Sequence, residues 1–368
     1  MKRSFLLLAS LLLLGSCIYP YDVQLTESEQ MLLVVDGDIA VGDRATLKLS
    51  ATGYNGPVLP DEWWVEDNQG GVYKPKGDSM EVDLRSAPTD RQYRMIILFN
   101  GKRYVTAFQG VLEPPVIEKI GFSADDNTVT CGVSFTGGTQ GSGYVAFTYE
   151  EIYQFHADYS VSYIFDPDSL ALIEMGPDMK DKAPTYYCWT KETQADEVVV
   201  DYTKLDSESA KDYPLMRFSR YNNRNHKDYR IKVWGRTITQ EEYDFRNNLA
   251  NLGRAGSNLF TPNPGEMAGN VRCETDPSER AMGYVTLSSS SSMTGTLDDR
   301  YAKYKNLDNT YLEFPEPDMY ERYYFVLGFR PVKDALKDDG SRGVGWGPLR
   351  CVDCLAAGGV LDEPQFRD

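Results

Sequence analysis

The chain has 368 residues, with 38 Lys and Arg against 55 Asp and Glu and a formal net charge of −17 at pH 7. This length predicts about two domains and leaves room for a sizeable core. The acidic balance argues against nucleic acid as a partner and against contact of the globular part with anionic lipid headgroups, because like charges repel.

The first sixteen residues predict an export signal. Lys2 and Arg3 are positive, residues 5–14 form an apolar run too short to span a bilayer, and Gly15-Ser16 precedes Cys17. This order is typical of a bacterial lipoprotein signal, which is cleaved before the cysteine that takes the acyl chains, such as palmitate. We therefore predict a signal at 1–16, lipidation of Cys17 and a tether at 17–29. The alternative is an ordinary secretory signal with an incidental cysteine.

Residues 30–112 predict a small β-sandwich of immunoglobulin-like or transthyretin-like type. Asn100-Gly101 separates two of the expected strands and suits a type I′ hairpin turn. Trp63 and Trp64 are adjacent on an expected strand, so one indole should face outward, where the neighbouring domain could cover it. The expected strands lie at 31–35, 46–50, 62–66, 91–99 and 102–108.

Glu113-Pro114-Pro115 cannot continue a central strand and marks the predicted domain boundary. Residues 113–368 are expected to form a larger β-rich sandwich domain with long loops. Between 145 and 165 every odd position except Glu151 is apolar, which predicts strands with one buried face and a break near Ala157. Further strands are expected at 116–122, 186–189, 197–200, 229–234 and 323–329, with a flexible polar run at 288–292.

One helix is predicted near 240–252. Thr239 and Glu242 form a capping box, in which each side chain can bind the backbone N–H of the other residue. Phe245, Leu249 and Leu252 then give a stripe expected to be buried, and Gly253 suits the end of the helix.

Lipidation of Cys17 leaves an odd number of cysteines: Cys131, Cys188, Cys273, Cys351 and Cys354. Cys351-Val-Asp-Cys354 has the spacing of redox and zinc sites, but no second such pair occurs and the two histidines are distant in sequence. An exported protein can form disulfides. We therefore predict a structural disulfide that uses Cys351 or Cys354, with Cys188 as the preferred partner for a long-range bond.

The sequence assigns no catalytic residue, cofactor or metal site. It contains none of the HExxH, GxSxG, phosphate-loop or dinucleotide patterns. Tyrosine is abundant, at 25 residues, and tyrosines line sugar and peptide sites as well as filling sandwich cores. The regular alternation between 145 and 165 favours a buried position in the core for the aromatic residues of that stretch.

Several short motifs keep their order along the mature chain. They are Val34-Val35-Asp36-Gly37, Pro114-Pro115 with Ile117, Cys188-Trp189, Leu259-Phe260 before Pro262 and Pro264, Gly269-Asn270-Val271, Gly283-Tyr284-Val285, Cys351 to Cys354, Gly358-Gly359 and Pro364-Gln365-Phe366. Together they resemble a Bacteroidota lipoprotein family catalogued as domain of unknown function 4249. The resemblance implies a β-rich outer-membrane lipoprotein whose gene often neighbours those of TonB-dependent receptors, and it supplies no catalytic residues. The end of the chain departs from the pattern, because no tryptophan follows Phe366.

Three functions follow as hypotheses. The first is a non-enzymatic accessory or binding lipoprotein at the outer membrane, anchored by its lipid and partnering a TonB-dependent receptor in nutrient uptake. The second is a hydrolase acting on glycan or peptide, with its acid and base among the many carboxylates. The third is a structural or adhesive envelope protein. The sequence leaves open the ligand and whether the protein faces the cell surface or the periplasm.

Overall fold

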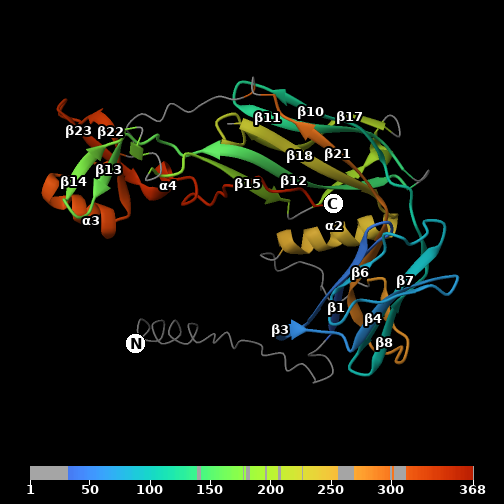
Figure 1. The fold of residues 1–368 in the computed structure, drawn as a ribbon. Helices are drawn as coiled ribbons and strands as arrows, with labels where there is room; N and C mark the ends of the chain where they lie inside the picture. Colours follow the sequence, from blue (N-terminus) through green and yellow to red (C-terminus); the bar gives the residue numbers. More distant parts are fainter. Residues whose placement is uncertain are drawn as a thin grey trace, which may run out of the picture.

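The computed structural model describes residues 32–367, except 139–141, 177, 180–182, 195–196, 206–208, 226, 256–268, 299–300 and 302–311. The predicted signal, Cys17 and the tether lie outside these residues. The described chain is mainly β, as predicted, and consists of two β-sandwiches and a smaller distal unit (Figure 1). The second sandwich lies between the other two parts in the figure.

The first sandwich packs two sheets around an apolar core that includes Val35, Trp63 and Ile97. Asn100 and Gly101 both have positive φ, as the predicted type I′ turn requires. One sheet has the order β20-β1-β2-β3 with β6 on β2, and the other has the order β19-β8-β7-β4-β5 with β9 on β7. The strands are β1 Leu33–Ala40, β2 Arg44–Ala51, β3 Tyr54–Val58, β4 Glu62–Asp67, β5 Val72–Tyr73, β6 Glu81–Asp83, β7 Gln92–Phe99, β8 Lys102–Thr106, β9 Gln109–Gly110, β19 Val271–Cys273 and β20 Ala281–Ser288.

Two strands of this sandwich come from far along the chain. β20 pairs in parallel with β1 from Leu33↔Ala281 onward, and β19 pairs with β8. Val285 and Leu287 enter the same core as β1. The first sandwich therefore needs residues 271–288, which lie outside the predicted range of 30–112.

The second sandwich also has two sheets, in the orders β10-β11-β17 and β15-β12-β18-β21, with β16 on β12. The predicted alternation holds along β12, where Val145, Phe147 and Tyr149 point into the core. The strand ends at His156, next to the expected break. The elements are β10 Val116–Ala124, β11 Thr128–Thr136, β12 Tyr144–His156, β15 Tyr187–Thr193, β16 Val198–Asp201, η2 Tyr202–Lys204, β17 Ser209–Ser219, η3 Asn223–Asn225, β18 Lys227–Thr237 and β21 Ser290–Thr296.

The expectation of a flexible run at 288–292 is wrong. β20 ends at Ser288 and β21 begins at Ser290, so this serine run turns from one sandwich directly into the other. Serine does not favour strands by itself, but pairing with β18 satisfies the backbone of β21.

The distal unit is built from two hairpins and short helices around a small core that includes Tyr159, Val332 and Val352 (Figure 1). The strand expected at 323–329 is wrong, because residues 320–325 are helical. Tyr320, Tyr323 and Tyr324 have helical spacing, and all three rings pack near Trp346 or Phe165. The elements are β13 Tyr163–Asp166, β14 Ala171–Glu174, η6 Pro317–Met319, α3 Tyr320–Phe325, β22 Phe329–Leu336, β23 Arg342–Pro348 and α4 Leu349–Val352.

Candidate functional site

A cleft of about 610 Å³ lies where the two sandwiches meet. One wall is the outer face of the β20-β1-β2 sheet, which contributes Asp38, and the other is the outer face of β12, β18 and β21. Odd-numbered residues of β18, such as Ile231 and Val233, fill the core. Because side chains alternate along a strand, the even-numbered residues lie on the outer face, toward the cleft. Trp234 and Arg236 therefore line the cleft, together with Arg367 from near the end of the described chain.

The predicted helix, α2 Gln240–Ala255, lies at this junction (Figure 1). Tyr243 stacks on Tyr144 of the second sandwich, with ring centroids 4.2 Å apart. Phe245 packs against Tyr284 of the first sandwich at 5.1 Å. The first turns of α2 thus contact both sandwiches.

Two details of the helix differ from the prediction. The Thr239 hydroxyl accepts from the Glu242 N–H at 3.1 Å, as a capping box requires, but the Glu242 carboxylate binds two arginines instead of reaching back. Leu249, expected to be buried, is exposed, because the described contacts of α2 with the sandwiches come from residues 242–246, before Leu249. The side chain of Leu252 lies outside the described residues.

Four charged side chains form a network beside the cleft. The Arg236 guanidinium donates to Glu197 at 2.9 and 3.2 Å and to Glu242 at 2.6 Å, and Arg246 binds the same two carboxylates. Burial alone would raise the pKa of Glu197, but Arg236 and Arg246 outweigh it and hold the pKa below its ordinary value. Arg236 Nη1 is buried and has no hydrogen-bond partner within the described part of the chain.

Asp38 faces Arg236 from the first sandwich. Its carboxylate accepts from the Thr286 hydroxyl at 2.6 Å. Burial raises the pKa of Asp38, an effect that Arg236 partly offsets. Two carboxyl groups in one cleft, one with a raised pKa and one with a lowered pKa, are typical of the acid and base pair in glycoside hydrolysis. Here, however, both oxygens of Glu197 are already bound by arginines, which is typical of a structural ion pair.

Residues 360–367 lie along the outer face of the β15-β12-β18 sheet and end at the cleft. Trp189 forms an isolated bridge with Val360, and the Arg367 guanidinium lies 4.1 Å from the centre of the Trp234 ring. This segment and the network around Arg236 were not predicted from sequence. The Thr239-x-x-Glu242 pattern was the signal closest to them.

The two adjacent tryptophans of β4 face opposite sides of the sheet, as expected. Trp63 is buried in the core, and Trp64 is partly exposed on the outer face. The Trp64 Nε1–H donates to Glu66 at 2.8 Å, and Lys74 Nζ lies 5.2 Å from the centre of its ring. The side chains that cover part of the outward indole in these contacts, Glu66 and Lys74, belong to the first sandwich itself.

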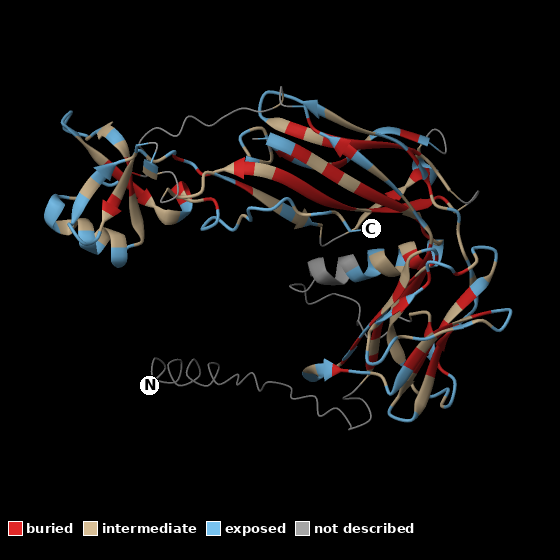
Figure 2. Ribbon diagram, in the orientation of Figure 1, coloured by how far each residue is buried: buried red, intermediate tan, exposed pale blue. Residues whose placement is uncertain are grey.

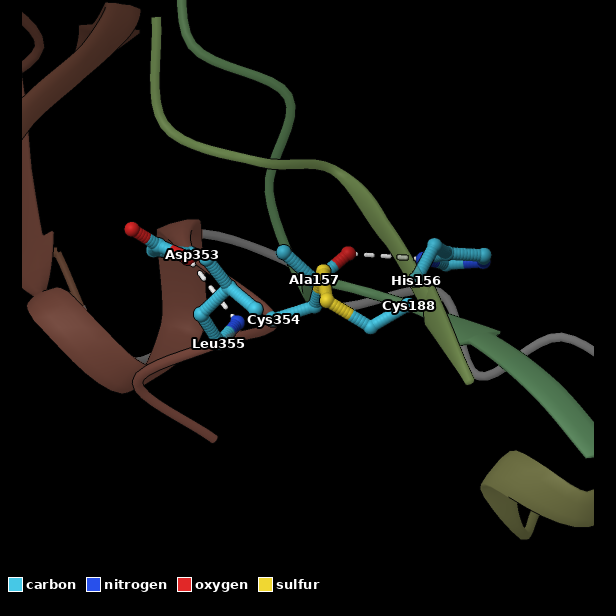
Figure 3. Close-up of a disulfide and its surroundings, with 6 residues drawn as sticks. All are labelled: His156, Ala157, Cys188, Asp353, Cys354 and Leu355. Atoms are coloured by element: carbon cyan, nitrogen blue, oxygen red, sulfur yellow. Dashed lines mark hydrogen bonds between the residues drawn. A yellow bond between two sulfur atoms is a disulfide. The ribbon is translucent and has the colours of Figure 1, made fainter. Parts of the chain in front are cut away.

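Cys188 and Cys354 form a disulfide, which is one of the two long-range pairings that the sequence left open for Cys188 (Figure 3). It joins β15 of the second sandwich to the chain just after α4 of the distal unit. Cys351 is free and buried, as are Cys131 and Cys273. Burial raises the pKa of the Cys351 thiol, and Asp158 raises it further, which disfavours the reactive thiolate.

The distal unit presents a run of three exposed apolar residues that begins with the last residue of α3. Phe325, Val326 and Leu327 are 60, 72 and 46% exposed. Figure 2 shows exposed residues along this helix at the end of the molecule opposite the first sandwich. We call these three residues the distal tip.

Among the residues that the structure describes, no three His, Cys, Asp or Glu side chains gather as a metal site would require. In the same part of the chain, no helix has the length and apolar character needed to span a membrane.

The sequence comparisons bear on the two sandwiches. A model of the family described as Domain of unknown function (DUF4249) matches residues 18–294. The chain belongs to this family. The match includes the cleft walls and α2 and ends within β21, so β22, β23, the distal tip and residues 360–367 follow it. No curated protein matches the chain.

Proposed function

We propose that the protein is a lipid-anchored binding protein of the outer membrane that partners a TonB-dependent receptor in nutrient uptake. The observation that carries partner binding is the distal tip. Three consecutive apolar side chains exposed to water cost free energy that contact with a partner recovers, at about 25 cal/mol per Å² of apolar area buried. The anchor rests on the order of residues around Cys17, and the receptor on the resemblance to the family.

The position of the tip supports this function. The described chain begins at Leu32, which binds Thr52 of the first sandwich, whereas the distal unit with the tip lies at the other end of the described chain (Figure 1). Tyr320, Tyr323 and Tyr324 stand just before the tip on α3. Aromatic residues are enriched at protein interfaces, where they bury a large area at low entropic cost.

The test is a pull-down from detergent-solubilised outer membrane with the acylated full chain as bait. We expect a large barrel receptor to co-purify, and the variant Phe325→Ser with Val326→Ser to lose it. Leu59→Ser is the matched control, because Leu59 is equally exposed but lies in the first sandwich. Mass spectrometry of the mature N-terminus should find acyl chains on Cys17.

Two outcomes would overturn the proposal. One is a receptor yield that the tip variant leaves unchanged. The other is hydrolysis of a glycan or peptide by the purified protein at an enzyme-like rate, abolished by Asp38→Asn. The second outcome would favour the hydrolase instead.

A further inference from the structure

The sheet that carries β12, β15 and β18 binds residues 360–367 mainly through their main chain. Lys191 Nζ donates to the Gln365 carbonyl at 2.9 Å, and Lys232 Nζ donates to the Arg367 carbonyl at 2.8 Å. The Arg367 N–H donates to the Glu150 carboxylate at 2.9 Å. Because these contacts use groups that every peptide has, they set an extended path without specifying its sequence.

Two side chains of the segment add sequence preference. Glu363 forms an ion pair with Arg230. Four residues later, the Arg367 guanidinium stacks on Trp234 and donates to the Thr148 hydroxyl at 2.9 Å. The face therefore recognises an extended chain in which an acidic residue precedes a basic residue by four positions.

Beyond the two main-chain hydrogen bonds between Trp189 and Val360, few contacts that bury apolar area hold the segment. Val360 and Leu361 are exposed, so they bury little apolar area, and exposed ion pairs contribute about 0–1 kcal/mol each. The Cys188–Cys354 disulfide fixes the chain six residues before Val360. A segment tethered in this way leaves and returns at an effective concentration on the order of millimolar.

The surface beneath the segment has the features of a binding site. Trp234 is 8% exposed and lies on the cleft wall, where Arg367 covers it. When the segment leaves, the indole, two lysines and Glu150 become available together. Lys191 Nζ lies 3.0 Å from the Glu150 carboxylate, and this ion pair does not involve the segment, so it holds the carboxylate in place to accept an N–H.

We propose that this face is a peptide-binding site, that residues 360–367 are its built-in occupant, and that an extended segment of a partner protein replaces them. The partner segment has Glu or Asp four positions before Arg or Lys. This inference deepens the proposed function, on which it rests for the existence of a partner, and places a second contact far from the distal tip.

The experiment uses a fluorescent peptide with the sequence of residues 360–367, capped at both ends, and the purified full chain. The variant Glu363→Ala with Arg367→Ala weakens the built-in occupant while leaving the main-chain contacts of the face intact. We expect this variant to bind the peptide at least about tenfold more tightly than the wild type, because a larger fraction of its sites is open. A peptide with the Glu and Arg exchanged should bind at least about tenfold more weakly.

Placing Trp234→Leu or Lys232→Glu on the weakened variant should abolish binding, and Lys74→Glu on the first sandwich is the matched control. The urea midpoint of each protein shows whether it is folded. Failure of the weakened variant to bind at millimolar peptide, or binding that survives Trp234→Leu, would overturn the proposal. The assay contains no membrane protein, so its result is independent of the pull-down that tests the proposed function.

Discussion

The two sandwiches accommodate buried charge differently. In the first, Asp67 lies at the end of β4, where its carboxylate accepts the N–H groups of Gln69 and Gly71 and binds Arg91 at 2.6 Å. In the second, Glu151 lies in the middle of β12 with only side chains around it: Arg224 at 2.9 Å and the Tyr229 hydroxyl at 2.6 Å. A turn can satisfy a carboxylate locally, whereas a central strand needs a partner from elsewhere in the fold.

The difference teaches how each sandwich depends on distant parts of the chain. Asp67 needs mainly its own turn. Glu151 needs η3, which brings Arg224 over the sheet, and Glu192, which binds the same guanidinium. The second sandwich is also the one tied by the disulfide.

The largest effect is expected from removal of the disulfide. Cys188→Ala with Cys354→Ala should lower the free energy of unfolding by about 5 kcal/mol, because the bond closes a loop with a sequence separation of 166. Urea unfolding measures the loss, and hydrogen exchange should place it in β12 and β15 rather than in β4 and β7. If both sandwiches lost protection from hydrogen exchange equally, the idea that only the second sandwich depends on the disulfide would be wrong.

A smaller effect is expected from Glu151→Gln. It leaves the Arg224 guanidinium without its buried counter-charge and should cost about 3 kcal/mol. The double variant with Arg224→Met should recover part of this loss, which a double-mutant cycle in urea measures. Glu62→Gln, at an exposed ion pair with Lys74, is the control and should change stability by less than about 0.5 kcal/mol. A Glu151 variant as stable as this control would contradict the prediction.

The smallest effect is expected from Asp67→Asn, at about 2 kcal/mol. Burial alone would raise the pKa of Asp67, but the Gly71 and Gln69 N–H groups and Arg91 lower it to about 2. A lowered pKa means that the charged form stabilises the fold above the ordinary value near 4, and that this stability is lost as the pH falls toward 2. Between pH 2 and 6, the free energy of unfolding should fall less steeply with decreasing pH in the variant than in the wild type. The same acid slope in both proteins would show that another group is responsible.

Local patterns predicted the elements whose causes are local. The alternation along 145–155, the Asn100-Gly101 turn and the Thr239 cap each act over a few residues, and each is present in the structure. The helical spacing of Tyr320, Tyr323 and Tyr324 was also a local signal, but the strand preference of aromatic residues favoured the wrong prediction. The sequence predicted a disulfide that uses Cys351 or Cys354, with Cys188 as the preferred long-range partner, and the structure pairs Cys188 with Cys354.

The rest depends on contacts that no short window contains. Nothing near β1 indicates that β20 will pair with it in parallel, since such pairing has no turn to mark it. The cleft network joins Arg236 on a strand, Glu242 on a helix and Glu197 on a loop, so only the assembled junction defines it. Glu151 was visible as the exception in its alternation, but its partner Arg224 was not.

The pairing of β1 with β20 also sets the order in which the protein is completed during synthesis. The chain is made from its N-terminus, so β1 and β8 are made well before the strands at 271–288 that cover their edges. Until then the first sandwich has two open edges, which readily pair with other chains. The second sandwich has most of its strands before residue 238 and can begin to fold during this interval. The half of the protein that is made first is thus the half that closes last, and this interval is when it depends most on protection from aggregation.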